Sequence, residues 1–456
     1  MILRLLCSSF ACSVLLLAAW TCDAIPDPVA STEGASESSL FAFVDVSVIP
    51  MDSERVLDHQ TVVVRNDRIV AVGPVDNVAI PDGAERLDGQ GQYLVPGLAE
   101  MHGHVPPPSA PAEFIEQVLF LYLANGITTV RGMLGAPGQL DLRARANSGA
   151  LLSPTLYLAG PSFNGGSVSS PAQAEAMVRE QHAEGWNLLK VHPGLSRAEY
   201  DAMARTANDL GIRFGGHVPA DVGLAHALDM GQETFDHVDG YVEYLGGDQG
   251  GALNDAALAA IVRRTREAGA AIVPTMALWE VLYGTLEVEM LQAYPELLFF
   301  PPNQVQQWAN NVQQRQANPD FDLAAARRVI ANRMRVLRAL HEGGVTILMG
   351  TDAPQLFSVP GFSLHRELER MAEAGMSPYA ILQSGTANVG AYFANEDTFG
   401  HVAEGHRADL LLVAANPLDD IAHLQQLSGV MVRGRWVPGE EIERRLDTIA
   451  RSHTAG

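Results

Sequence analysis

The sequence predicts an α/β fold in which a (β/α)8 TIM barrel carries a small β-sandwich domain built from both chain ends. The central region alternates short apolar runs with longer stretches of helical character. Both chain ends instead contain short alternating strands separated by turn residues. The central apolar runs number eight, which is the number of strands that closes a parallel α/β barrel.

Residues 1–24 are expected to be a signal peptide. Arg4 precedes an apolar run at 14–20, and Ala24 offers a cleavage site before a stretch rich in proline and serine. A membrane anchor is less expected, because the apolar run is shorter than the roughly 20 residues that a span needs. Lipidation of Cys22 is an alternative, although the residues before it fit a lipoprotein signal poorly. We expect an exported protein, periplasmic or secreted, without stable membrane insertion.

The composition excludes some classes of partner. All three cysteines lie in the expected signal peptide, so the mature chain has no disulfide and depends on its apolar core. The net charge of −23 is the same with or without residues 1–24, and it argues against nucleic acid and anionic membranes as partners. We therefore expect a small-molecule substrate, and the sequence leaves a homo-oligomer open.

The remaining boundaries follow changes in pattern along the chain. We expect a polar linker at 25–39 and a β-sandwich domain made of 40–95 and 396–440. The barrel is expected at 96–395 and a C-terminal tail at 441–456.

The barrel strands are identified by apolar runs that precede helical stretches. The eight candidates are 97–102, 127–131, 155–159, 188–192, 213–217, 234–237, 271–275 and 345–349. The connection at 278–342 is much longer than the others and contains amphipathic helix. A connection of that length usually includes a lid over the active face.

Lys190 is the only lysine in a chain with 30 lysine and arginine residues, and it lies within an apolar run. Lys190 either remains by chance in a chain that otherwise uses arginine, with its amine reaching the end of the strand, or it supplies chemistry that arginine cannot. An unprotonated amine can add CO₂ to form a carbamate that bridges two metal ions, whereas arginine stays protonated.

Metal-competent side chains occur at the predicted carboxyl ends of five strands. These residues are His102, His104, Lys190, His217, His237 and Asp352. Each one alone is a weak signal, but active-site groups of such a barrel lie at this end. Four imidazoles and a carboxylate suit Zn²⁺, and an anion between two such ions would reduce their repulsion.

This order of ligands resembles the binuclear subtype of the amidohydrolase superfamily. The segments 95–98, 126–131, 350–353 and 408–411 resemble the branch with imidazolonepropionase-like proteins and Xaa-Pro or Xaa-Arg dipeptidases. The resemblance spans roughly residues 40–440. Family members often have aspartates where this chain has Glu100 and Gly132, which puts supporting hydrogen bonds and substrate contacts in question.

The resemblance implies two divalent ions, expected to be zinc. His102, His104, Asp352 and carboxylated Lys190 would hold the first ion, and the second would share Lys190 with the two remaining ligands, His217 and His237. A hydroxide bridging the ions would attack an amide carbonyl, with Asp352 as general base and then general acid. Tyr241 and Tyr244 are candidate donors to the developing oxyanion, although a packing role suits them equally well.

The expected function is hydrolysis of an amide bond in a dipeptide or an N-acyl amino acid. Arg131 is a candidate partner for a substrate carboxylate, with a structural ion pair as an equal alternative. His192 is a further substrate-binding candidate, although packing suits it better. A cyclic amidase, lactonase or deaminase would use the same metal site. A non-catalytic periplasmic binding protein is disfavoured, because it would not need the proton shuttle Asp352.

Overall fold

The computed structural model describes residues 39–454. The expected signal peptide and all of the linker except Ser39 lie outside the described residues. The described residues belong to one compact unit.

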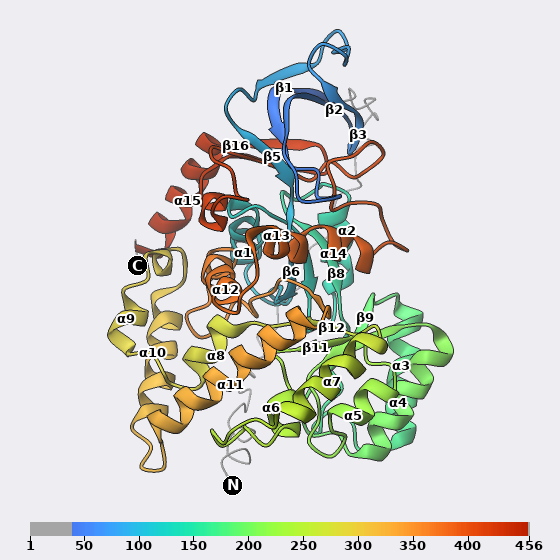
Figure 1. The fold of residues 1–456 in the computed structure, drawn as a ribbon, viewed down its shortest axis with the longest axis vertical. Coiled ribbons are helices and arrows are strands. Elements are labelled where there is room, and N and C mark those ends of the chain that lie inside the picture. The colour runs from blue at the N-terminus through green and yellow to red at the C-terminus, as the bar shows by residue number, and fades with distance from the viewer. Residues whose placement is uncertain (1–38, 455–456) are drawn as a thin grey trace, which may run out of the picture. The chain divides into compact units, whose positions relative to one another are not determined.

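Strands from both chain ends form one sheet (Figure 1). The strands are β1 (Leu40–Val48), β2 (Leu57–Arg65), β3 (Arg68–Pro74), β4 (Glu85–Asp88), β5 (Tyr93–Pro96), β14 (Leu410–Val413), β15 (Leu427–Val432) and β16 (Arg435–Pro438). Their order is β16-β15-β14-β5-β1-β2-β3, with β4 beside β1. The antiparallel pair of β5 and β14 joins the two chain ends. Alternating apolar side chains, among them Phe43, Val64 and Met431, pack into a core of their own.

Eight further strands follow one another in the central region, as the sequence predicts. They are β6 (Leu98–Gly103), β7 (Ile127–Gly132), β8 (Thr155–Leu158), β9 (Leu188–Val191), β10 (Arg213–Gly216), β11 (Thr234–Asp236), β12 (Ala271–Val273) and β13 (Thr346–Ile347). Neighbours pair in parallel within two sheets, β6-β7-β8 and β9 to β13. Because both faces of the parallel strands are covered, β6 and β9 are buried at every residue.

Hydrogen bonds connect these two sheets at both edges. Ala159 forms a parallel bridge with Leu188, which joins β8 to β9. On the other side, the N–H of Met101 donates to the carbonyl of Met349 over 2.8 Å, and the N–H of Asp352 donates to the carbonyl of His102 over 2.7 Å. The eight strands therefore form a closed ring, in agreement with the predicted barrel.

Several of the strands end earlier than predicted. His237, Thr275 and Asp352 have φ angles of 66°, 51° and 64°, in the left-handed region that is unfavourable for residues other than glycine. The extended conformation therefore stops before these residues, which the apolar pattern had assigned to strands or to their ends. Such strain is often found at functional sites.

Helices alternate with the central strands. They include α1 (Ala112–Ala124), α2 (Gln139–Asn147), α3 (Pro171–Glu184), α4 (Arg197–Leu210), α5 (Leu224–Asp229), α6 (Tyr241–Tyr244), α7 (Asp255–Glu267), α12 (Phe362–Glu373), α13 (Pro378–Gly385) and α14 (Ala387–Tyr392). Their limits follow local signals in the sequence. Ser196 and Glu199 form a capping box at the start of α4, for example, and Ser170 caps α3 ahead of Pro171.

The long connection between β12 and β13 is helical, as predicted. It contains α8 (Met276–Leu282), α9 (Val288–Gln292), the 3₁₀ helix η2 (Pro295–Phe299), α10 (Pro302–Gln316) and α11 (Leu323–Glu342). Asp322 caps the start of α11 by accepting from the N–H of Ala325. A second 3₁₀ helix, η3 (Ile421–Gln425), precedes β15, and α15 (Gly439–Thr454) occupies the expected C-terminal tail.

Candidate metal centre

The six predicted metal ligands lie at or just beyond the carboxyl ends of the central strands. In chain order they are His102 in β6, His104 after β6, Lys190 in β9, His217 after β10, His237 after β11 and Asp352 after β13. Lys190 has no exposed surface, and His102 and His237 are each 1% exposed. Polar groups removed from water in this way need partners.

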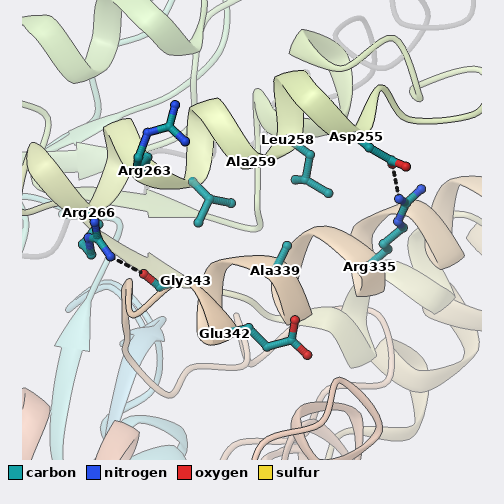
Figure 2. Close-up of a pocket in the computed structure, with 10 residues that line it drawn as sticks. Asp255, Leu258, Ala259, Arg263, Arg266, Arg335, Ala339, Glu342 and Gly343 are labelled. Atoms are coloured by element: carbon teal, nitrogen blue, oxygen red, sulfur yellow. Dashed lines mark hydrogen bonds and ion pairs between the residues drawn. The ribbon is translucent and has the colours of Figure 1, made fainter.

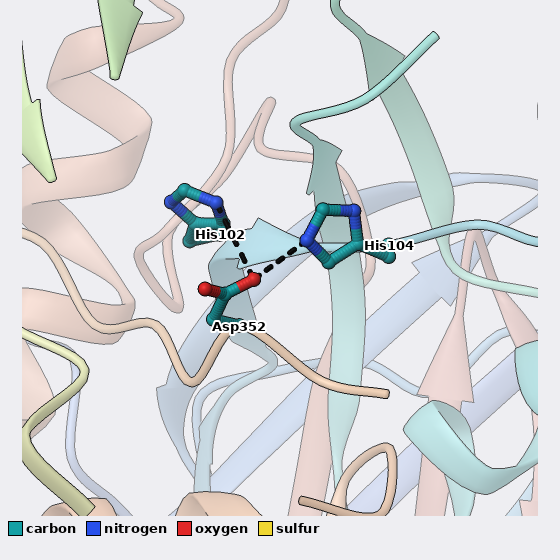
Figure 3. A group of neighbouring side chains, drawn as sticks. All are labelled: His102, His104 and Asp352. Carbon is teal, nitrogen blue, oxygen red and sulfur yellow. Dashed lines mark hydrogen bonds and ion pairs between the residues drawn. The ribbon is translucent and has the colours of Figure 1, made fainter. Parts of the chain in front are cut away.

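His102, His104 and Asp352 form a group that suits a metal ion (Figure 3). Oδ1 of Asp352 lies 2.6 Å from Nε2 of His104 and 3.5 Å from Nε2 of His102. The three ligand atoms all lie within 4.8 Å of one another. Two imidazoles and a carboxylate converging in this way provide the three protein ligands of a typical catalytic zinc site.

The other three predicted ligands adjoin this group. Nζ of Lys190 lies 3.1 Å from Nε2 of His102. Nε2 of His237 lies 3.7 Å from Oδ2 of Asp352. The ring centroids of His217 and His237 are 4.6 Å apart. The two oxygens of Asp352 thus face different histidines, so all six side chains form one continuous cluster.

The donor set of this cluster fits a bound cation. Nε2 of His237 is buried and has no hydrogen-bond partner among residues 39–454, whereas its Nδ1 lies 2.7 Å from Oγ1 of Thr275. A buried polar atom without a partner costs about 1–3 kcal/mol, which coordination would offset. Burial, assisted by neighbouring positive charges, holds the pKa values of His102 and His237 well below the usual range. Both rings are therefore neutral, and neutral imidazole is the form that binds metals.

The environment of Lys190 raises the fraction of its amine that is uncharged near neutral pH. Burial lowers the pKa of Lys190 to about 8, although Asp236 and Asp352 oppose this shift. Gly216, with φ of +121°, allows the close packing on this side chain. A Cβ at residue 216 would lie 2.5 Å from the carbonyl oxygen of Val191 and 3.0 Å from Cδ of Lys190. Only glycine fits here, so the backbone of β10 confines the lysine side chain.

Three residues that the sequence analysis did not single out orient the histidine rings. Oδ2 of Asp236 lies 2.7 Å from Nδ1 of His102, and Oδ2 of Asp239 lies 2.6 Å from Nδ1 of His217. Thr275 contacts His237 in the same way. Because these contacts lie on the Nδ1 side of the rings, they would leave the Nε2 atoms available to a metal ion. The aspartates adjoin His237 in sequence, but the pattern alone did not show which rings they would contact.

Arg131 adopts the second of the two roles that the sequence left open. It is fully buried, and its NH2 group lies 3.2 Å from both carboxylate oxygens of Asp236. Its Nε donates to the carbonyl of Met101, and its NH1 donates to Oγ1 of Thr234. The guanidinium is therefore committed to an ion pair that supports the site, which disfavours a contact with a substrate carboxylate.

The tyrosines and His192 lie in different surroundings. The hydroxyl of Tyr241 is buried and lies 2.8 Å from Oγ1 of Thr265 in α7, which favours the packing role. Tyr244 is 49% exposed and remains a candidate donor. The ring of His192 stacks on that of His217 with centroids 5.0 Å apart. This contact places His192 beside the cluster, in agreement with packing.

Glu100 connects β6 to the loop that carries Asp352. Its Oε1 accepts from the N–H groups of His102 and Thr351 over 3.0 and 2.8 Å, and its Oε2 accepts from the hydroxyl of Thr351. Burial raises the pKa of Glu100 to about 8 despite these hydrogen bonds. The glutamate that departs from the family pattern thus holds the two strand ends together.

Replacing Glu100 with alanine should destabilise the protein. Glu100→Ala leaves two buried N–H groups and a hydroxyl without their acceptor, so we expect a loss of unfolding free energy on the order of 3 kcal/mol or more. Urea unfolding of the metal-free protein would measure it. Glu100→Gln is the matched control, because it keeps the side-chain shape and one acceptor oxygen, and should cost much less. Equal stability of the alanine variant and the wild type would contradict the bridging role.

A surface groove between α7 and α11 is separate from the metal cluster (Figure 2). Its lining includes Asp255, Leu258, Arg263, Arg266, Arg335 and Glu342, and none of the six candidate ligands. The groove therefore provides no argument for catalysis.

The sequence model of the amidohydrolase family matches residues 93–437, which is most of the chain. The chain belongs to the amidohydrolase family. This confirms the resemblance identified from the strand-end ligands. In this amidohydrolase, His102, His104 and Asp352 form a group that could hold a metal ion.

Solved structures of other proteins share the fold of this amidohydrolase. A candidate prolidase from Bifidobacterium longum is 25% identical and has a TM-score of 0.69, with 90% of this chain and 99% of that chain covered. A bottromycin amidohydrolase is 24% identical with a TM-score of 0.73, and the match covers 91% of this chain and 90% of that chain. A Xaa-Pro dipeptidase with bound methionine in its active site is 21% identical with a TM-score of 0.65, and the match covers 88% of this chain and 100% of that chain. The amidohydrolase thus shares its fold with these three proteins.

Sequence relatives of this amidohydrolase include deaminases. Adenine deaminase 3 of Rhizobium meliloti is 23% identical over 392 residues, which cover 81% of this chain and 52% of that protein. Adenine deaminase of Nitratidesulfovibrio vulgaris is 28% identical over 190 residues, covering 35% of this chain and 32% of that protein. The matched region thus spans about half of the first deaminase and a third of the second. Among residues 39–454, no helix combines the length and apolar character needed to cross a membrane.

Proposed function

We propose that this amidohydrolase cleaves the amide bond of a dipeptide or an N-acyl amino acid with the help of two divalent ions, preferably zinc. The observation that carries the proposal is the position of Asp352 between two sets of ligands. Its Oδ1 faces His102 and His104, and its Oδ2 faces His237. A single ion would leave part of this cluster without a function.

Lys190 is the proposed bridge between the two halves of the cluster. His102, His104 and Asp352 would hold one ion, and His217 and His237 would hold the other. The lowered pKa of Lys190 supports a neutral amine that can add CO₂, because carbamate formation needs the unprotonated form. The resulting anion would serve both ions and remove the buried positive charge.

The chemistry assigned to the residues of the chain concerns proton transfer and orientation. When bound, the ions would supply Lewis acidity and lower the pKa of a coordinated water to about 7. The Asp352 side chain is 9% exposed and presents an oxygen to each side of the cluster. It can accept the proton of the attacking water and deliver it to the leaving amine. Asp236, Asp239 and Thr275 keep the imidazoles oriented during this exchange.

Aromatic residues beside the cluster favour a substrate with an apolar group. The ring of Trp279 in α8 lies 5.9 Å from that of His237, and the ring of Tyr283 lies 5.6 Å from Trp279. These side chains are partly exposed. They would provide apolar contact area next to the reacting bond.

Deamination is the second candidate function, and the deaminase relatives favour it. Nucleophilic attack on a ring carbon that carries an amino group would use the same ligands and the same proton shuttle. Cyclic amides and lactones are further electrophiles that this site could attack. A non-catalytic binding protein is disfavoured, because the family match and the intact Asp352 both support hydrolysis.

A panel of substrates tests the proposed function. We expect kcat/KM for the best dipeptide or N-acyl amino acid to exceed that for adenine by at least about 10²-fold. A substrate that leaves a buried polar group of the site without a partner loses at least this much in kcat/KM. Amino acid release and ammonia release would be measured in parallel on the zinc-loaded enzyme. Faster release of ammonia from adenine would move the assignment to the deaminase, and hydrolysis confined to lactones would exclude both candidates.

We also propose that the protein is exported, with residues 1–24 as its signal peptide and a small molecule as its partner. The charged, apolar and small-residue pattern of this segment supports export. N-terminal sequencing of the mature protein from the periplasm or the medium would test it, and an acylated Cys22 would instead indicate a lipoprotein. Sedimentation of the same material would show whether it forms a homo-oligomer.

A further inference from the structure

Arg333 is a buried cation in α11, within the long connection between β12 and β13. It is 1% exposed. Its NH1 group donates to the carbonyl oxygen of His237, which is 96 residues away in sequence. Its NH2 group lies 3.3 Å from Oδ1 of Asp239. A buried guanidinium needs such partners, because an unpaired charge is very costly away from water.

The contacts of Arg333 converge on one half of the metal cluster. The other oxygen of Asp239, Oδ2, lies 2.6 Å from Nδ1 of His217. A single guanidinium thus holds the backbone of His237 directly and the ring of His217 through Asp239. The hydrogen bonds and ion pairs of Arg333 include none with His102, His104 or Asp352.

Trp279 fixes the plane of this guanidinium. The central carbon of the Arg333 group lies 3.8 Å from the centroid of the Trp279 ring, a distance that indicates a cation–π contact. The planar, forked guanidinium can reach two acceptors while it stacks on an aromatic face. A lysine ammonium cannot reproduce this combination of contacts. The position is therefore specific for arginine and not only for a positive charge.

We infer that Arg333 is a positioning residue that holds His217 and His237 in place for the second metal ion. This inference rests on the proposed two-metal function. Through Asp239, Arg333 fixes the orientation of the His217 ring so that Nε2 faces the cluster. Through the carbonyl of His237, it fixes the left-handed backbone on which that ring is mounted. Loss of the guanidinium should therefore weaken the binding of the second ion and leave the binding of the first ion unchanged.

Stepwise titration of the metal-free protein with Zn²⁺ tests this inference. Competition with a chromophoric chelator would give the affinity for each ion, and atomic emission would give the number of ions per chain. For Arg333→Met we expect a 10- to 100-fold loss of affinity for the second ion, the usual scale for residues that support metal ligands. The affinity for the first ion should remain within twofold of the wild type. Arg333→Lys should recover little of the loss.

Arg335→Met is the matched control. Arg335 lies on the same helix, its side chain is 48% exposed, and it pairs with Asp255 across the surface groove (Figure 2). Its replacement should change neither affinity. If Arg333→Met does not fold, Asp239→Asn provides the second test, because it keeps the shape of the bridge but removes its charge. We expect that variant to have a lower affinity for the second ion and an unchanged affinity for the first.

The outcomes separate this inference from the proposed function. Two ions bound to Arg333→Met with wild-type affinities would overturn the positioning role, and so would equal weakening of both ions. A wild-type protein that binds only one ion would overturn the two-metal function, and the positioning role with it. Because that result comes from the wild type alone, the two failures cannot be confused.

Discussion

Replacing Lys190 with arginine should lower the bound zinc from about two ions per chain toward one or none and abolish most of the activity. Lys190 is fully buried, and its Nζ lies 3.1 Å from Nε2 of His102. Arginine keeps a positive charge at this position and cannot form a carbamate, so it would repel the ions that the carbamate attracts. Metal analysis after dialysis, together with the rate on the best substrate, would measure both effects.

Lys190→Ala removes the amine without adding a larger side chain, so it separates the loss of the carbamate bridge from the steric effect of arginine. The alanine variant leaves space beside Gly216 in which a short-chain carboxylic acid can take the place of the carbamate. We expect millimolar acetate or propionate to restore part of the activity and the second ion to this variant and to have no such effect on Lys190→Arg. Full metal content and activity in the arginine variant would exclude the carbamate.

The order and direction of the central strands could be predicted from the sequence, whereas their ends could not. Apolar runs separated by helical stretches mark buried parallel strands, because both faces of such strands are covered. The ends depend on backbone conformation. His237 and Thr275 carry side chains compatible with a strand, but tertiary contacts hold them in the left-handed region.

The metal ligands were predictable for a related reason. The carboxyl ends of parallel strands meet on one face, so the sequence alone predicts that residues at those ends lie close together. No such rule predicts the contacts that support the ligands. Arg333 and His237 are 96 residues apart, and the interaction follows from the path of α11. Arg131 stands at a strand end like the ligands, and only its depth of burial and its pairing with Asp236 indicate a supporting role.

Asp352→Asn should fold and retain much of the metal, yet lose roughly 10²-fold or more in kcat, the usual scale of acid–base contributions. An asparagine keeps an oxygen that can face His102 and His104 but cannot accept a proton near neutral pH. Its amide would replace one of the two oxygens that the aspartate presents to the cluster. Rates measured with saturating substrate and excess Zn²⁺ would separate proton transfer from residual metal loss.

Asp201→Asn is the control for this variant. Asp201 pairs with Nε2 of His226 over 2.5 Å, which reproduces the contact of Asp352 with Nε2 of His104 outside the metal cluster. A general effect of replacing an aspartate that contacts a histidine would appear in both variants, whereas loss of the proton shuttle would appear only in Asp352→Asn. If the Asp352 variant with full metal content turned over at nearly the wild-type rate, Asp352 would be a ligand alone, and the proton would have to leave by another group.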